Sequence, residues 1–115
     1  MAMADKEYKC ILSNDHEHFV SYYQVLNYVY VENMAEKRAP HRAAHLAHAR
    51  EAAAKGDLLI GGAFEDMEHG MMLFRSAAAA EEFGMNDPYV LNELVPHFGI
   101  RMLSAAAGSF HEELS

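Results

Sequence analysis

The stretch HRAAHLAHAREAAAKGDLLIGGAF, residues 41–64, decides the fold of this chain. Its first part is rich in alanine, the strongest helix former, and Gly56 stands where a helix would end. Its last part, DLLIGGAF (57–64), is a short apolar run typical of a buried strand. We therefore predict a helix over residues 34–55, with Pro40 in a first turn, followed by a strand. Residues 34–38 either join this helix or form a separate turn, because proline disfavours helix for the residue ahead of it.

Further elements lie on both sides of this stretch. An early segment dense in Tyr and Val is typical of a strand, and an Ala-rich segment after residue 76 favours a helix. Asp87 and Pro88 suit an N-cap and the first position of a short helix that ends near Pro96. The predicted order is βαββαβ, from a strand over 22–31, the helix over 34–55, strands over 57–64 and 71–76, helices over 77–86 and from 87, and a last strand over 97–103.

The chain has the size of one domain. Its 115 residues are enough for a single core and too few for two. We assign residues 22–103 to an α+β domain, residues 1–21 to an N-terminal extension with the acidic cluster NDHEH (14–18), and residues 104–115 to a weakly structured tail.

The first predicted strand is apolar on both of its faces. Tyr23, Val25, Val29 and Val31 share one face, and Tyr22, Leu26, Tyr28 and Tyr30 share the other. Such a strand is covered on both sides. The helices of the domain supply one cover, and a chain this small has no second layer to offer. The pattern therefore predicts a homodimer.

Composition restricts the class of partner. The formal net charge of −8 argues against nucleic acids and anionic membranes, which need a basic surface. The single cysteine, Cys10, allows no internal disulfide, and the N-terminus shows no export signal, so we expect a cytoplasmic protein. No apolar run approaches the ~20 residues that a membrane span needs. A protein that acts on a small molecule or on another protein fits this composition best, with a small-molecule ligand as our expectation. We expect no bound cofactor.

His45 and Asp87 are the candidate catalytic residues. His45 lies about one turn into the predicted helix, and Asp87 begins the second short helix. A carboxylate beside an imidazole fixes its tautomer and raises its basicity, which suits a general base or acid. The alternative is structural, since an N-cap Asp before Pro stabilises a helix by itself. No Ser or Cys is placed to complete a triad, so proton abstraction is favoured over acyl transfer.

Arg42, Gly61 and Gly62 are candidate substrate-binding residues. Arg42 either binds a substrate carboxylate or pairs with Glu36 or Glu51 on the helix surface. The two glycines either form a bulge or leave space and free N–H groups beside a ligand.

Histidines at positions 41, 45 and 48 lie at helical spacing and raise the question of a metal site. The glutamate of the H-E-x-x-H zinc motif is absent, because Arg42 follows the first histidine. We expect no metal here, and we expect His41 and His48 to face solvent.

The residues from Arg42 to Leu46 (RxxHL), the strand from Gly56 to Phe64 and the segment DPYV (87–90) resemble the YciI-like, or YCII-related, family. The resemblance covers roughly residues 22–103. It implies a ferredoxin-like fold, in which helices cover one face of a four-stranded antiparallel sheet. It also implies a dimeric α+β barrel, formed by two such sheets packed face to face. The extension and the histidines at 41 and 48 depart from the family pattern.

The resemblance places His45 and Asp87 at the paired His and Asp of a family cleft. The wider group includes muconolactone isomerases and enzymes of chlorinated-aromatic breakdown, which implies a lactone-, diketone- or halogenated-ring-like substrate. Two function classes stay open. One is a lyase or isomerase that uses His45 and Asp87, and the other is a non-catalytic ligand-binding or accessory module. Contact between the two side chains in an apolar cleft favours the enzyme, whereas an Asp87 that only caps its helix favours the module.

Overall fold

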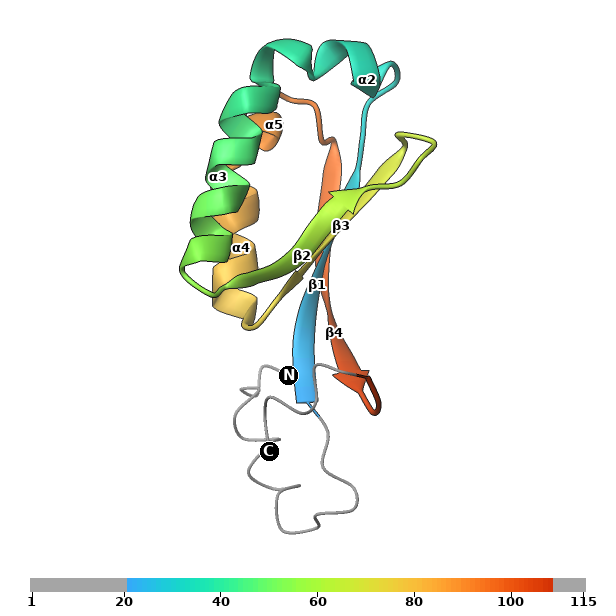
Figure 1. Cartoon of the computed structure of the whole chain (residues 1–115). Helices are drawn as coiled ribbons and strands as arrows, with labels where there is room; N and C mark the ends of the chain where they lie inside the picture. The colour runs from blue at the N-terminus through green and yellow to red at the C-terminus, as the bar shows by residue number, and fades with distance from the viewer. Residues whose placement is uncertain (1–20, 109–115) are drawn as a thin grey trace, which may run out of the picture.

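The computed structural model describes residues 21–108 and has the predicted α+β architecture. Four strands form one antiparallel sheet in the order β2-β3-β1-β4. The strands are β1 (Ser21–Val29), β2 (Leu58–Ala63), β3 (His69–Phe74) and β4 (His97–Ala105). Helices α3 (Arg42–Ala54) and α4 (Ala77–Asn86) cover one face of this sheet, together with the short α5 (Pro88–Leu91) (Figure 1). The βαββαβ order and the ferredoxin-like topology are thus confirmed.

The predicted helix over 34–55 is divided into three pieces. A short helix α2 (Met34–Lys37) and a 3-10 turn η2 (Ala39–His41) precede α3. Pro40 lies inside the 3-10 turn, where its missing N–H and its effect on the preceding residue interrupt regular helix. Residues 34–38 therefore form a separate turn, one of the two alternatives in the sequence. The predicted end of the helix is confirmed, because Gly56 has a φ of 84° just past α3.

Strand β2 differs from the prediction of a buried strand. It is an edge strand, and only Leu58 among its residues is buried. An edge strand has a neighbour on one side alone, so an apolar run does not ensure burial. A shift in register between Leu58 and Ile60 also bends the strand at this point.

The helix that begins at Pro88 ends at Leu91, earlier than predicted. Glu93 adopts a left-handed conformation with a φ of 63°, which closes the turn. The N–H of Leu94 then bonds to the carbonyl of Tyr89 at 2.9 Å, as a helix-terminating turn does.

The strands reach slightly beyond the predicted domain limits. β1 begins at Ser21 and β4 continues to Ala105, each within two residues of the assigned boundary. Cys10 and the NDHEH cluster lie outside the described residues. Within residues 21–108, no helix is long and apolar enough to cross a membrane.

The two faces of the sheet have different surroundings. On the helix side, Leu26, Tyr28 and Phe74 have no exposed surface and join the side chains of α4 in one core. On the other side, strand pairing places Val25, Leu73 and Arg101 side by side. That second face also carries Val29, Ile60 and Leu103, which are 37%, 59% and 47% exposed. The described part of the chain thus leaves apolar surface open on the face away from its helices.

Candidate active site

Asp87 is positioned by the junction of two helices. It follows α4 directly and has the extended conformation of an N-cap, with Pro88 at the first position of α5. Its Oδ1 accepts a hydrogen bond of 3.0 Å from the N–H of Tyr89. The predicted cap is therefore present. Asp87 has no exposed surface, so each oxygen needs partners inside the protein.

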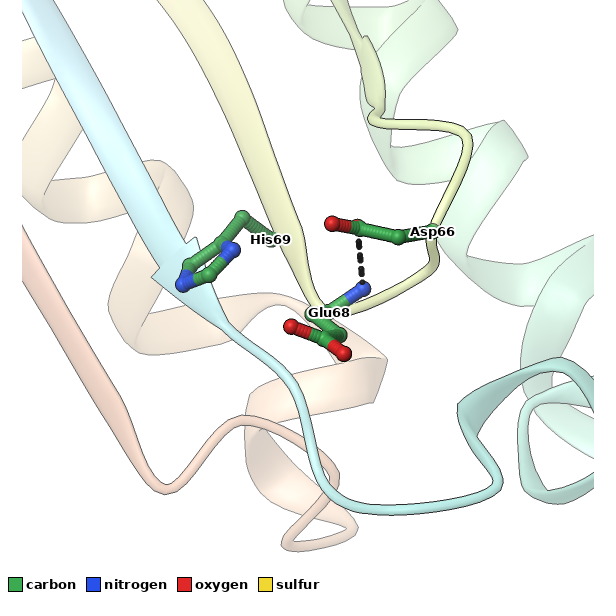
Figure 2. Close-up of side chains that lie close together, drawn as sticks. All are labelled: Asp66, Glu68 and His69. Carbon is green, nitrogen blue, oxygen red and sulfur yellow. Dashed lines mark hydrogen bonds between the residues drawn. The ribbon is translucent and has the colours of Figure 1, made fainter.

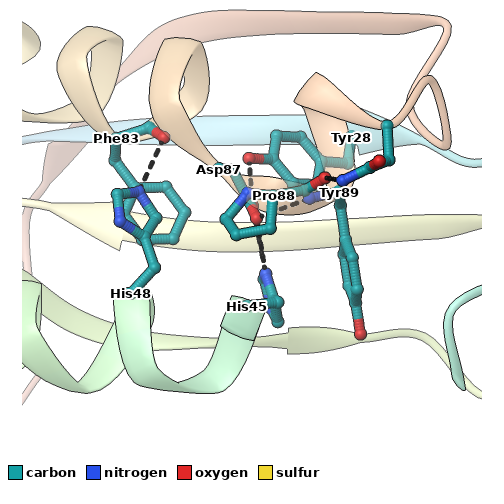
Figure 3. Close-up of polar contacts among 8 residues, drawn as sticks. Tyr28, His45, His48, Phe83, Asp87, Pro88 and Tyr89 are labelled. Atoms are coloured by element: carbon teal, nitrogen blue, oxygen red, sulfur yellow. Dashed lines mark hydrogen bonds and ion pairs between the residues drawn. The ribbon is translucent and has the colours of Figure 1, made fainter. Parts of the chain in front are cut away.

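His45 and Tyr28 supply the remaining partners of the Asp87 carboxylate. The Nδ1 of His45, on the first turns of α3, lies 2.8 Å from Oδ1 and 3.1 Å from Oδ2. The hydroxyl of Tyr28, on β1, donates to Oδ2 at 2.7 Å. Figure 3 shows the three side chains converging from helix, loop and sheet. The carboxylate thus joins α3, β1 and α5 at one point, and it favours the tautomer of His45 in which Nδ1 carries a proton, because a carboxylate only accepts hydrogen bonds.

Aromatic rings fix the plane of the His45 imidazole. The ring of Tyr89 stacks on it with centroids 3.9 Å apart and an angle of 6°. Phe83 of α4 meets it edge-on at 6.4 Å. The tautomer and the orientation of His45 are therefore both constrained, which leaves Nε2 as the ring nitrogen available to a ligand.

A cleft of about 400 Å³ lies in front of His45. It is bordered by α3, by β2 and by the end of β1. It contains four of the five predicted site residues, Arg42, His45, Gly61 and Gly62. Asp87 is fully buried and does not line the cleft, and it contacts His45, which does. Apolar side chains line the rest of this cleft together with a few polar groups, and they include Leu46, Leu58, Phe64 and Met72.

Arg42 and the two glycines have distinct surroundings. Arg42 lines the cleft, and within residues 21–108 it forms no ion pair with Glu36 or Glu51. A Cβ atom at Gly61 would lie 2.5 Å from Cγ of Met72, whereas one at Gly62 would meet nothing within 4 Å. Gly61 is therefore required for close packing of the strand, and Gly62 leaves open space. Their roles in binding remain predictions.

Sequence reasoning missed Tyr28, Tyr30, Arg38 and Tyr89. Tyr28 lies on the helix-facing side of β1, Tyr30 follows two residues later just past the strand, and Tyr89 belongs to the DPYV segment. None of these signals separates a site residue from a core residue. Burial raises the pKa of Tyr28, and the charge of Asp87 raises it further. Tyr28 therefore stays a neutral hydrogen-bond donor to the carboxylate.

The other histidines of the HRAAHLAH segment do not join His45. His41 lies in the turn η2, ahead of α3. His48 donates from Nε2 to the carbonyl of Phe83 at 3.0 Å, and its ring stacks on Phe83 with centroids 4.3 Å apart. The expectation that His48 faces solvent was wrong, because α4 packs directly over this part of α3 and offers it both an aromatic face and a free carbonyl.

One group of potential metal ligands lies outside the cleft. Asp66, Glu68 and His69, in and after the β2–β3 turn, bring their ligand atoms within 4.8 Å of one another (Figure 2). All three residues are exposed, and Asp66 already accepts the N–H of Glu68 at 2.8 Å. This is an ordinary arrangement for a polar hairpin turn, and we assign no function to it.

Comparisons with known proteins bear on the family and the fold of this chain. A profile of the YCII-related domain matches residues 10–103. The fold is similar to that of 5-chloro-2-hydroxyhydroquinone dehydrochlorinase (TftG) from Burkholderia phenoliruptrix AC1100, solved in complex with 2,5-dihydroxybenzoquinone. That match has a TM-score of 0.58 and 19% identity over 69% of this chain and 90% of the other. Rv0793 from Mycobacterium tuberculosis matches with a TM-score of 0.48 and 14% identity, over 76% and 97%. No curated protein matches. Because the family profile spans most of the sequence, the chain belongs to the YCII-related domain family.

Proposed function

We propose that this chain is a cytoplasmic small-molecule enzyme of the lyase or isomerase type, in which His45 and Asp87 transfer a proton. The observation that carries the proposal is the 2.8 Å contact between His45 Nδ1 and a fully buried Asp87, at the wall of a cleft. A carboxylate that caps a helix needs no histidine. The contact therefore favours an enzyme over a ligand-binding module, for which capping alone would suffice.

The proposed reaction starts with a C–H bond beside a carbonyl group. Nε2 of His45 takes the proton, and the electron pair of the C–H bond moves into the carbonyl to give an enolate. Asp87 stabilises the imidazolium that forms, because its ionised carboxylate accepts a hydrogen bond from the N–H at Nδ1. The enolate then either expels a leaving group from the neighbouring carbon or takes the proton back at another carbon. The first outcome is a lyase reaction and the second an isomerisation.

The cleft and the fold suggest where to search for a substrate. The cleft volume suits a single ring or a short chain. The similar dehydrochlorinase acts on a chlorinated hydroxyquinol and was solved with a dihydroxyquinone. Enolisable cyclic carbonyl compounds, with and without a halide as leaving group, are therefore the first compounds to assay.

Deuterium exchange tests the proton-transfer step without knowledge of the full reaction. A panel of enolisable cyclic ketones and diketones is incubated with the protein in D2O, and loss of the α-proton signal is followed by NMR. We expect the protein to accelerate exchange for at least one compound. His45→Asn should slow that exchange by about 10²- to 10⁴-fold, the usual contribution of a general base.

His48→Asn is the matched control, since His48 lies one turn further along α3 and outside the cleft. It should exchange at the wild-type rate. An equal loss in both variants would indicate a structural effect, and undiminished exchange in His45→Asn would contradict the proposal.

We also infer that the protein is a homodimer. Val29, Ile60 and Leu103 are exposed on the sheet face away from the helices, next to Val25 and Leu73. A second copy packed on this face would remove that apolar surface from water and give the facing sheets of an α+β barrel. The cleft lies on the helix side of the sheet, so this pairing leaves it open.

A further inference from the structure

Among residues 21–108, the hydroxyl group of Tyr89 has no hydrogen-bond partner. Its oxygen is buried, and Tyr89 as a whole is only 2% exposed. Figure 3 shows the ring beside His45, with its backbone N–H at Asp87 and its hydroxyl at the opposite end. Tyr89 also lines the cleft. A buried hydroxyl without a partner is unfavourable, so a ligand that accepts its hydrogen bond would recover that cost.

Arg38 brings positive charge to the same cleft. Its side chain is half-buried, and no carboxylate within residues 21–108 forms an ion pair with it. Burial, and then the neighbouring Tyr89, raise the pKa of Tyr30 to about 12. Arg38 lies close enough to Tyr30 to oppose this rise in pKa. Tyr30 is therefore a neutral donor next to Tyr89. The other charged groups that line the cleft are Arg42 and Glu65.

The positive charge of this cleft contrasts with the rest of the protein. The whole chain has a formal charge of −8, yet two arginines and one glutamate line the cleft. A half-buried guanidinium without an anion is unfavourable, because a charge removed from water needs a partner. A negatively charged oxygen on a ligand would satisfy Arg38 and Tyr89 together.

We propose that Tyr89 and Arg38 form an oxyanion subsite, and that the substrates are enolisable carbonyl compounds whose oxygen becomes negative there. This inference rests on the proposed proton transfer and names its substrate class. As the C–H proton moves to Nε2 of His45, the electron pair of that bond reaches the carbonyl oxygen. The Tyr89 hydroxyl donates a hydrogen bond to this oxygen, and the Arg38 guanidinium balances its charge. No proton leaves Tyr89.

A stable enolate serves as the probe. Cyclohexane-1,3-dione is an acidic diketone that is present as its enolate at neutral pH, and 3-methoxycyclohex-2-enone has the same ring and two oxygens but no charge. Calorimetric titration of the full chain should show that the enolate binds at least tenfold more tightly than the ether. Tyr89→Phe should weaken enolate binding about tenfold, the effect of one hydrogen bond to a charged group, and should weaken ether binding less, because the ether offers only a neutral carbonyl oxygen.

Arg38→Met should weaken enolate binding by a similar factor and reduce its dependence on salt. Arg50→Met is the matched control, because Arg50 is exposed on α3 and lies outside the cleft. His45→Asn should still bind the enolate. The two proposals can thus fail separately. Undiminished deuterium exchange in His45→Asn would contradict the proton-transfer proposal, whereas unchanged enolate binding in Tyr89→Phe and Arg38→Met would contradict the subsite.

Thermal unfolding without ligand gives an independent check. Tyr89→Phe removes a hydroxyl that has no partner, so its midpoint should equal or exceed that of the wild type. A midpoint lower by several degrees would show that the hydroxyl has a structural partner and would overturn the subsite. Enolate binding no tighter than ether binding in the wild type would overturn it too.

Discussion

Among single residues, Asp87 combines a structural role with a candidate chemical one. Its Oδ1 caps α5 through the N–H of Tyr89 and also faces His45 Nδ1, 42 residues away in sequence. Its Oδ2 is held by the Tyr28 hydroxyl. The cap orients the carboxylate and the carboxylate orients the imidazole, so local helix geometry fixes the position of a distant side chain.

Substitution of Asp87 should separate these two roles. Asp87→Ala removes the cap and leaves the Tyr28 hydroxyl buried without an acceptor, which should lower the free energy of unfolding by about 2–4 kcal/mol in urea. Asp87→Asn keeps an oxygen for the cap and should cost less. Its amide is a weaker acceptor, however, so the population of the Nδ1–H tautomer of His45 should fall.

Ring ¹⁵N chemical shifts report that tautomer directly. His48 is an internal reference, because its partner is the Phe83 carbonyl in every variant. An unchanged His45 tautomer in Asp87→Asn would mean that the pair does not act as a unit.

Among the secondary-structure elements, β2 forms one wall of the cleft and depends on Gly61. Gly61→Ala would place a methyl group 2.5 Å from Cγ of Met72, which is buried in the core. We expect a loss of stability of about 1–3 kcal/mol, as for other overpacked sites. Gly62→Ala is the matched control and should stay within about 0.5 kcal/mol of the wild type, because nothing lies within 4 Å of its Cβ position. Equal effects of the two changes on urea unfolding would refute this account of the strand.

Two tyrosines in and just after strand β1, Tyr28 and Tyr30, should make the protein sensitive to alkali. Burial raises the pKa of Tyr30 from 10.0 to about 12, and burial also raises the pKa of Tyr28. Between pH 10 and about pH 12, Tyr30 has lost its proton in the unfolded chain but still holds it in the folded chain. The free energy of unfolding should therefore be constant below about pH 10 and fall as the pH rises toward 12.

Urea unfolding at several pH values, with tyrosinate absorbance as a second signal, measures this effect. Tyr30→Phe removes one of the two groups and should make the decline shallower. A decline as steep in Tyr30→Phe as in the wild type would show that Tyr30 does not contribute.

For the whole molecule, we propose that the sheet face away from the helices forms the dimer interface. Ile60→Lys places a charge on this face, whereas Leu91→Lys places one on α5 in the helix layer. The side chains of Ile60 and Leu91 are similarly exposed, at 59% and 63%. In analytical ultracentrifugation at about 10 μM, the wild type and Leu91→Lys should sediment as dimers and Ile60→Lys should shift toward monomer. The interface should bury roughly 2,000 Å² or more. A monomeric wild type would contradict the dimer.

The sequence by itself determined the order of the elements and the identity of the paired residues. Alanine-rich helices, Tyr- and Val-rich strands and the Asp87–Pro88 cap are local signals, and local propensity decides them. The resemblance to the YCII-related family selected His45 from three histidines that spacing alone did not separate.

Only the tertiary structure decided what surrounds each of these residues. Two contacts join segments that are distant in sequence: the stack of Tyr89 on His45 and the hydrogen bond from Tyr28 to Asp87. Packing of the same segments also leaves the Tyr89 hydroxyl unpartnered. The same holds for the exposure of β2, which follows from its place at the edge of the sheet, and for His48, which packs against Phe83 of α4. Sequence patterns report which face of an element is apolar, but the partner of that face is fixed by packing across the whole chain.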